Sequence, residues 1–378
     1  MSAFATFQRH YVINDGAAAN YGQTFQFPLR DRNWWLTHID VMATVRLSAA
    51  VVTPTADSVL ALVKNIALEV NEQEGGNRLV VNASGPALVD LGRQWYGFSD
   101  PLTHYSYRRL GASGDIIGAV YPIAFQNPLV PQPNAYALAL PLMRYGSDPQ
   151  LRITTADTAS SMGATFTHAT AGTLGVRLEA VCTYAEVIDP QGTFPHWRQE
   201  IVTTHNPHIW GGTGQRAVED VSQGNLLLGI LQQDYLNGGT RGFAVQADGT
   251  DAAMAAVLQK YQWEYRGRIV RELTPLLGQN LNFQSMSNVA SASGFSPHAF
   301  TPSAGVYQPH ASLYWDWLTD RTMTDAYSTR SGLDLSPLAL NGGKLRLVAS
   351  SIGHASNNSR LTTWKLVGDP RRFSQVTL

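Results

Sequence analysis

Apolar and polar residues alternate over many short stretches of the chain, which predicts β-strands that each have one buried and one exposed face. In the longest stretch, Leu178, Ala180 and Cys182 share one face, whereas Arg177 and Glu179 lie on the other. This stretch covers residues 174–187, and comparable alternation covers residues 39–48, 66–71, 135–142, 261–265, 313–317 and 344–350. Loops rich in Gly, Pro and Asn separate these stretches, so the pattern predicts an all-β protein built from sandwiches or barrels.

A short helix is predicted directly after a hairpin in the first half of the chain. Residues 60–71 and 78–82 form the two strands of this hairpin. Ser84 can then cap a helix, Pro86 fits its first turn, and Gly97 is placed to end it.

The second half of the chain shows the same module. Residues 257–265 and 268–273 can pair across Arg266-Gly267, a two-residue turn of the kind that tight hairpins favour. A second helix is predicted to begin at Thr274, with Pro275 following it. The two modules form a weak internal repeat of structure, not of sequence.

The chain divides at a cluster of turn-forming residues, Asp189-Pro190-Gln191-Gly192. At about 100–200 residues per domain, 378 residues predict two or three domains, and the repeat favours two of nearly equal size. We predict an N-terminal segment at residues 1–22, a first sandwich at 23–190 and a second at 191–378. Long loops at residues 100–118, 156–172 and 237–253 would form an outer crown at one end.

Charge is scarce in this sequence. Charged residues make up 15% of the chain, against roughly 25% in an average soluble domain. With 27 Lys and Arg against 28 Asp and Glu, the formal net charge is −1, which argues against a general nucleic-acid binder. A hydrophobic content of 44% argues against intrinsic disorder. A large surface with so little charge favours a protein whose surface is covered by neighbouring copies.

Targeting and redox signals are few. Cys182 is the only cysteine, which excludes an intrachain disulfide and a cysteine-based metal cluster, and its place in a strand predicts a small core residue. No apolar run approaches the roughly 18–20 residues of a bilayer span, and the first residues lack the pattern of a signal peptide. We expect synthesis in a reducing cytoplasm.

The histidines are the first candidates for chemistry. His205 and His208 flank Asn206-Pro207, but a zinc site needs three or four converging ligands, and His196, His298 and His310 are scattered. We interpret these histidines as loop residues that bind no metal.

Other patterns of catalytic or binding residues are incomplete. Residues 211–216 resemble a phosphate-binding loop but lack its Lys-Ser/Thr, so they are interpreted as a turn between strands. No Gly-x-Ser-x-Gly motif occurs, and the sparse carboxylates form no evident pair for glycoside hydrolysis. We therefore predict no catalytic, cofactor-binding or metal residues. Four tryptophans could stack on sugars or bases, but are favoured as core or subunit-contact residues: Trp34, Trp35, Trp315 and Trp317.

The order and spacing of several segments carry a resemblance. Residues 58–70 and 85–97 form a strand, hairpin and helix, and residues 141–154 and 174–187 follow at the end of the first half. The second half ends with short strands at Gly305-Val306-Tyr307, Leu333-Asp334-Leu335 and Lys344-Leu345-Arg346-Leu347. Together these segments, over most of residues 24–366, resemble the double jelly-roll major capsid proteins of tailless membrane-containing bacteriophages and adenovirus.

This resemblance implies a fold and a function. The fold would be two eight-stranded jelly-roll β-sandwiches side by side, with short flanking helices and long outer loops. The function would be structural and not enzymatic, with homotrimeric, pseudo-hexagonal capsomers tiling an icosahedral virus shell. The implied partners are neighbouring capsomers, vertex (penton) and minor capsid proteins, and an internal lipid membrane where the virion has one. No direct nucleic-acid binding is expected, and the protein would be made in the host cytoplasm and reside in the virion capsid.

Two other classes of protein stay open at this point. A carbohydrate-binding or host-attachment protein, such as a spike or lectin-like β-sandwich, predicts the four tryptophans exposed in a groove at one loop end. A two-domain β hydrolase predicts a pair of carboxylates in a cleft. The capsid hypothesis predicts the tryptophans buried in the barrels or between subunits.

Overall fold

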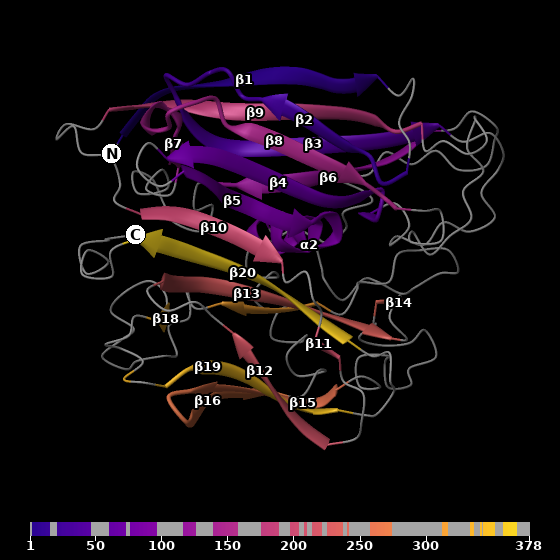
Figure 1. The fold of residues 1–378 in the computed structure, drawn as a ribbon, viewed down its shortest axis with the longest axis vertical. Helices are drawn as coiled ribbons and strands as arrows, with labels where there is room; N and C mark the ends of the chain where they lie inside the picture. The colour runs from indigo at the N-terminus through magenta and orange to yellow at the C-terminus, as the bar shows by residue number, and fades with distance from the viewer. Residues whose placement is uncertain are drawn as a thin grey trace, which may run out of the picture. The chain divides into compact units, whose positions relative to one another are not determined.

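A computed structural model of the chain shows two compact units, Met1–Val202 and Thr203–Thr377 (Figure 1). The sequence pattern predicts this division between residues 190 and 191. The structure describes residues 2–15, 21–46, 60–72, 76–96, 116–125, 139–157, 175–188, 197–203, 208–209, 214–220, 225–236, 240–241, 258–273, 312–316, 333–335, 341, 343–351 and 358–368. None of the helices in these ranges is long and apolar enough to cross a membrane.

The first sheet of unit 1 is antiparallel and has the order β1-β9-β3-β6, with β7 also pairing with β3. Its strands are β1 (Ser2–Asp15), β3 (Trp35–Arg46), β6 (Ile116–Ala124), β7 (Leu140–Pro141) and β9 (Arg177–Ile188). The sequence had treated residues 1–22 as a segment apart from the first sandwich. In the structure, β1 pairs with β9 from Ser2 opposite Ile188 to Asp15 opposite Arg177, so it is a strand of this sheet.

The second sheet of unit 1 has the order β10-β5-β4-β8-β2. β10 runs parallel to β5, and the remaining pairs are antiparallel. The strands are β2 (Thr24–Pro28), β4 (Val63–Glu72), β5 (Gly76–Ser84), β8 (Gln150–Thr155) and β10 (Trp197–Thr203). A short 3-10 helix, η2 (Leu142–Arg144), follows β7.

The core of unit 1 is formed by alternate residues of its strands, as the period-two pattern predicted. Val41 of β3, Leu178 and Cys182 of β9, and Leu68 of β4 are all fully buried. Tyr121 of β6 is buried among them, and its hydroxyl donates a hydrogen bond to the carbonyl oxygen of Leu60 at 3.0 Å. A buried hydroxyl that lacked such an acceptor would destabilise the fold.

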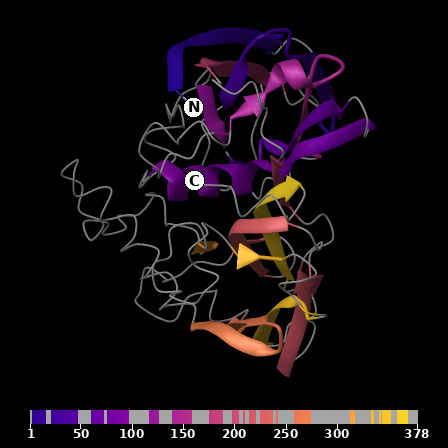
Figure 2. The same ribbon diagram turned by 90° about the vertical axis from the view of Figure 1, so that its left-hand side faces the viewer.

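Helix α2 (Gly85–Tyr96) confirms the first predicted helix. Ser84 caps it, because its hydroxyl accepts a hydrogen bond from the backbone N–H of Ala87 at 3.4 Å. Leu88 and Leu91 are fully buried, and Figure 2 shows the helix running across one side of the strands of unit 1. The second predicted helix, at Thr274, lies outside the described residues.

The described strands of unit 2 form two groups. In the first, β13 pairs with β14, β17, β18 and β20, and β11 pairs with β20. These strands are β11 (His208–Ile209), β13 (Asn225–Leu236), β14 (Thr240–Arg241), β17 (Ser312–Asp316), β18 (Leu333–Asp334) and β20 (Asn358–Gly368). The second is the antiparallel sheet β12-β19-β15-β16. Its strands are β12 (Gly214–Asp220), β15 (Leu258–Tyr265), β16 (Arg268–Leu273) and β19 (Leu345–Ser351).

Strands β13 and β20 are buried on both faces. Every residue from 226 to 233 and from 361 to 366 is buried, including Gln232 and Thr362. The hydroxyl oxygens of Thr362 and Thr203, the first residue of unit 2, lie 2.8 Å apart, so these buried hydroxyls satisfy one another. Strands covered on both faces lose the alternation of apolar and polar residues.

Both predicted hairpins are present. β4 pairs with β5 and β15 pairs with β16, each in antiparallel register. Arg266 and Gly267 form the two-residue turn between β15 and β16, with φ angles of 55° and 76°. Positive φ at both central residues matches the twist of the flanking strands.

We predict that Gly92→Ala destabilises the protein even though alanine favours an isolated helix. A Cβ at this position in α2 would lie 2.3 Å from Cγ of Pro122 in β6, whose ring cannot move aside. Overpacking of this kind costs about 1–3 kcal/mol, which exceeds the gain of about 1 kcal/mol in helix propensity. Urea unfolding would measure the change in free energy.

Gly76→Ala is the matched control for this variant. Nothing lies within 4 Å of a Cβ at Gly76, but its φ is +71°, so only backbone strain of about 1–2 kcal/mol is expected. A Gly92→Ala protein that is more stable than the wild type would contradict the packing described for α2.

Candidate functional site

Within the described part of the chain, the candidate metal-binding and catalytic residues do not form a cluster. His208 lies in β11, whereas His196, His205, His298 and His310 fall outside the described residues. No group of three or more His, Cys, Asp or Glu able to hold a metal ion occurs within the described ranges. Gly214 begins strand β12, and residues 211–213 before it lie outside the described residues. Cys182 is a buried core residue, as predicted.

Neither Trp34 nor Trp35 belongs to an exposed row of aromatic side chains. Trp35 is 2% exposed and packs with Ala139 and Ala185. Trp34 is half-buried and meets the ring of Phe7 edge to face, with ring centres 4.9 Å apart. The side chain of Trp315 and all of Trp317 lie outside what the structure describes. The exposed aromatic row that a sugar-binding protein would need is therefore not present at Trp34 and Trp35.

An aromatic cluster fixes β1 on the rest of unit 1. Phe7 stacks on Tyr184 of β9 at 5.2 Å, and Tyr11 packs on Phe27 of β2 at 4.9 Å. The Tyr11 hydroxyl donates a hydrogen bond to Asp31 at 2.7 Å and lies 3.4 Å from the Tyr184 hydroxyl. Rings on the inner face of β1 thus bridge β9 of one sheet and β2 of the other.

Burial changes the acidity of this cluster. Desolvation is the main cause that raises the pKa of Tyr11 to about 12, and the neighbouring Asp31 raises it further. Desolvation also raises the pKa of Cys182 to about 12 and raises the pKa of Tyr184 above its ordinary value. The hydroxyls and the thiol therefore stay neutral around neutral pH, which suits an interior structural cluster and not a nucleophile.

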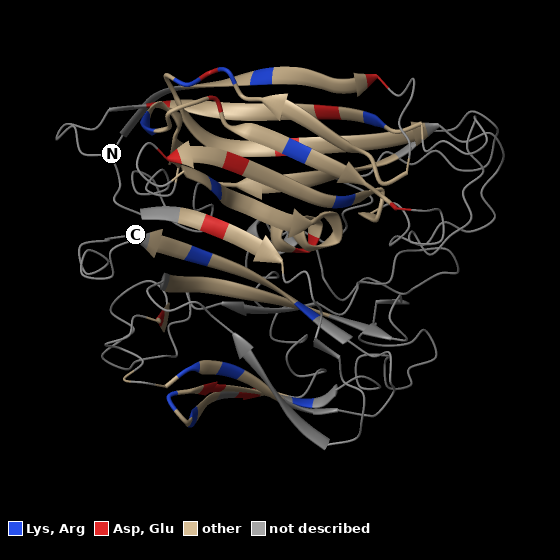
Figure 3. Cartoon of the chain, viewed as in Figure 1, with Lys and Arg blue, Asp and Glu red and all other residues tan. Residues whose placement is uncertain are grey.

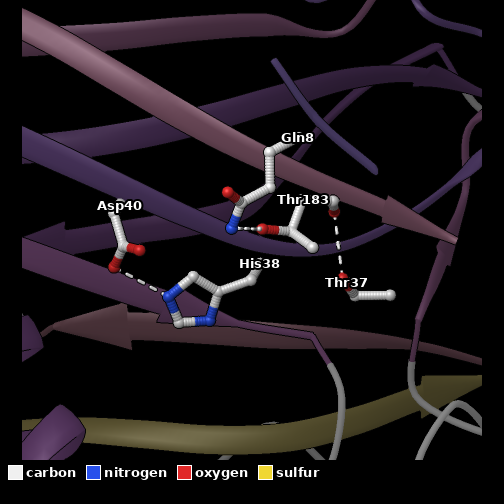
Figure 4. A network of polar contacts seen from close by, with 5 residues as sticks. All are labelled: Gln8, Thr37, His38, Asp40 and Thr183. Carbon is white, nitrogen blue, oxygen red and sulfur yellow. Dashed lines mark hydrogen bonds and ion pairs between the residues drawn. The ribbon is translucent and has the colours of Figure 1, made fainter. Parts of the chain in front are cut away.

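The outer face of the β1-β9-β3 part of the first sheet carries a polar network (Figure 4). Nε2 of His38 lies 2.7 Å from Oδ1 of Asp40, and the Gln8 side chain donates to the Thr183 hydroxyl at 3.3 Å. We call this surface the Val12 face. It comprises Gln8, His10, Val12 and Asp15 of β1, Arg177, Glu179, Val181 and Thr183 of β9, and His38, Asp40 and Met42 of β3.

Glu179 is the most connected side chain of the Val12 face. Its Oε1 accepts a hydrogen bond from Arg177 Nη2 at 2.6 Å and lies 3.3 Å from Nε2 of His10. Val12, 50% exposed, sits directly opposite Glu179 in the β1–β9 register. Val12 is thus an exposed aliphatic side chain that lies directly beside a carboxylate of the neighbouring strand.

The second sheet of unit 1 presents paired polar side chains on its outer face. The Thr24 and Thr154 hydroxyls lie 2.9 Å apart, the Gln26 amide donates to Gln150 at 3.2 Å, and the Asn65 amide donates to Asn82 at 2.9 Å. Arg152 forms an ion pair with Glu69 between the same strands. The three uncharged pairs on this face satisfy part of its hydrogen-bonding capacity within the sheet.

The hairpins of the two units share an unusual local structure. In each, a glutamate faces an exposed aliphatic residue: Glu69 faces Leu79, and Glu264 faces Ile269. A register shift lies immediately before the glutamate in both hairpins, and an exposed arginine immediately precedes the aliphatic residue in both. Such irregularities change the direction in which the neighbouring side chains point.

The sequence pattern does not predict these surfaces. Residues 261–265 were recognised as a strand and Arg266-Gly267 as a turn, but nothing in the one-dimensional pattern marked Ile269 as exposed. The Val12 face combines residues far apart in the chain, so only the β1–β9 register brings Val12 to Glu179. The neighbouring Phe7 and Tyr11 were the available signal that residues 2–15 form a strand.

The chain is similar to known proteins in structure and not in sequence. No protein-family model matches the sequence, and no curated protein matches it. The crystal structure of the MCP of Sulfolobus turreted icosahedral virus (STIV) is similar, with a TM-score of 0.61 and 14% identity over 99% of each chain.

Two further solved structures are similar to the chain. VP54 of PBCV-1, fitted into a reconstruction of the virophage Sputnik, has a TM-score of 0.59 and 11% identity over 96% of this chain and 94% of its own. The major capsid protein of bacteriophage PM2 has a TM-score of 0.52 and 13% identity over 95% and 97%. These neighbours are double jelly-roll major capsid proteins, and the predicted all-β, double jelly-roll fold is confirmed.

We predict that alkaline pH destabilises unit 1 through the aromatic cluster. An unfolded tyrosine releases its proton near pH 10.0, whereas Tyr11 in the fold holds it to about pH 12. The native state then binds more protons than the unfolded state, so the free energy of unfolding falls as pH rises from about 10 to about 12. Urea unfolding at several pH values would measure this slope, and Tyr11→Phe should reduce it.

Phe7→Leu serves as the control because it weakens the ring packing but keeps both hydroxyls. It should lower stability equally at every pH and leave the slope unchanged. A Tyr11→Phe protein with the full wild-type slope would show that Tyr11 does not carry this linkage.

Proposed function

We propose that this protein is a viral major capsid protein that acts by self-assembly and not by catalysis. The observation that carries the proposal is the likeness to the STIV MCP over 99% of both chains, at a TM-score of 0.61. The likeness extends over nearly the whole of both chains, and the solved structures similar to this chain include major capsid proteins.

The duplicated unit supports a three-fold capsomer with a pseudo-hexagonal outline. The chain has two compact units, so three copies present six. A trimer of this kind can meet six neighbours on an icosahedral shell, and closed rings of identical subunits form through head-to-tail contacts. We infer that the protein forms homotrimers and that these tile the shell.

The surface chemistry of unit 1 supports burial between copies. On its second sheet, cross-strand pairs such as Thr24–Thr154, Gln26–Gln150 and Asn65–Asn82 satisfy one another without charge. Interface centres are depleted in charged residues, and polar groups buried there need partners. Where the polar groups of a face are already paired, binding of a partner depends mainly on shape complementarity.

The other proposed partners are components of the virus particle that would contact each trimer. Neighbouring capsomers, vertex (penton) proteins and minor capsid proteins would surround each trimer, and an internal lipid membrane would lie beneath it where the virion has one. With a formal net charge of −1, the protein is not proposed to bind the genome directly. Its location would be the virion capsid, after synthesis in the host cytoplasm.

We predict that the purified protein has the mass of a trimer. Size-exclusion chromatography with light scattering should give about 124 kDa, three times the chain mass of 41.2 kDa, because the low-charge faces favour association over exposure to water. A stable 41.2 kDa species in neutral buffer at all concentrations tested would contradict the capsomer proposal.

A further inference from the structure

Large apolar side chains are rarely exposed in the described part of the chain. The described residues expose three of them: Val12 at 50%, Leu79 at 40% and Ile269 at 57%. Each lies among charged side chains on a strand, and each is therefore the apolar centre of a small polar surface. The charges around Val12 and Ile269 are of opposite sign.

The surface around Ile269 is basic. Arg266, Arg268 and Lys344 are all exposed there, and the backbone N–H of Arg266 donates to the carbonyl oxygen of Lys344 at 3.3 Å, which holds the turn beside β19. Figure 3 shows basic residues gathered at this turn end of β15 and β16. Glu264 is the carboxylate paired with Ile269 in the register. We call Arg266, Gly267, Arg268, Ile269 and Lys344 the Ile269 end.

The Val12 face is acidic. Its carboxylates are Asp15, Asp40 and Glu179, against the single guanidinium of Arg177, with histidine counted as neutral. Glu179 lies opposite Val12, and Asp15 lies opposite Arg177 in the same register. Asp15 on β1 and Glu179 on the neighbouring β9 therefore flank the exposed valine, and Asp40 lies on β3, one strand further away.

We propose that the Ile269 end of one copy packs on the Val12 face of a second copy. Ile269 would contact Val12, and Arg266 at the turn and Lys344 beside it would face Glu179 and Asp15, with Arg268 adding positive charge at the same hairpin end. This inference rests on the proposed function, because it names the contact through which copies join. It is a head-to-tail contact between different surfaces, the kind that closes three copies into a ring.

Charge complementarity is the reason to assign a second copy as the partner. The chain as a whole is nearly neutral, with 27 basic against 28 acidic residues, yet these two surfaces depart from neutrality in opposite directions. Opposite patches steer two partners together and fix their register, and an apolar centre within a polar rim supplies the buried contact.

The hairpin of unit 1 offers a matched comparison inside the same chain. Arg78 and Leu79 of β5 repeat the geometry of Arg268 and Ile269, including the facing glutamate and the preceding register shift. Next to them, however, the register places Glu72 and the uncharged pair Asn71–Asn77, so this hairpin lacks the basic flank of the Ile269 end. The proposal therefore predicts different roles for two arginines in the same local structure.

Charge reversal of both surfaces tests the contact on the full-length protein. Arg266→Glu with Arg268→Glu, and separately Asp15→Lys with Glu179→Lys, should each weaken trimer formation at least about tenfold by sedimentation velocity across a concentration series. The four substitutions combined should restore association, because the signs are opposite again. Arg78→Glu, the control, should associate like the wild type.

Circular dichroism and the melting temperature of each variant would establish that it is folded. The proposal is overturned if wild type forms trimers and the folded Arg266→Glu/Arg268→Glu protein forms them equally well. It is also overturned if Arg78→Glu weakens association as much as the Ile269-end variant does, or if the fourfold combination fails to restore it while folded. These results would leave the capsid proposal standing, whereas a monomeric wild type would remove both.

Discussion

The structure of unit 1 depends on the pairing of β9 with β1 on one side and β3 on the other. These two ladders decide which face of the sheet turns inward, because a slip of one residue would exchange the two faces. Leu178, Ala180 and Cys182 then enter the core, and Arg177 and Glu179 point outward. The core, the aromatic cluster around Tyr184 and the Val12 face all follow from this one register.

Sequence patterns predicted the parts of the fold whose signal is local. β9 was recognised from its alternation, α2 from its cap at Ser84, and the β15–β16 hairpin from its two-residue turn. β13 and β20 gave no such signal, because residues 226–233 and 361–366 are buried on both faces. β1 was missed because its inner row, Phe7, Arg9 and Tyr11, mixes aromatic rings with an arginine; Arg9 itself lies 5.5 Å from the Phe7 ring.

The interaction surfaces could not be predicted from the sequence for a different reason. Each is created by a register between strands, and a register is a long-range property of the fold. Glu264 and Ile269 lie close in sequence, yet their pairing depends on the irregularity that precedes Glu264. The same irregularity before Glu69, which faces Leu79, indicates that the internal repeat extends to the detail of the hairpin, although the residues around it differ in charge.

The β1–β9 register also determines when the first sheet can be completed during synthesis of the chain. Ser2 pairs with Ile188, so the first strand made must wait for nearly all of unit 1 to leave the ribosome before it finds its partner. The Val12 face is assembled from both strands, and it is absent from any shorter nascent chain. A truncated or half-made chain therefore lacks this surface, which restricts any contact that uses it to chains whose first unit has been completed.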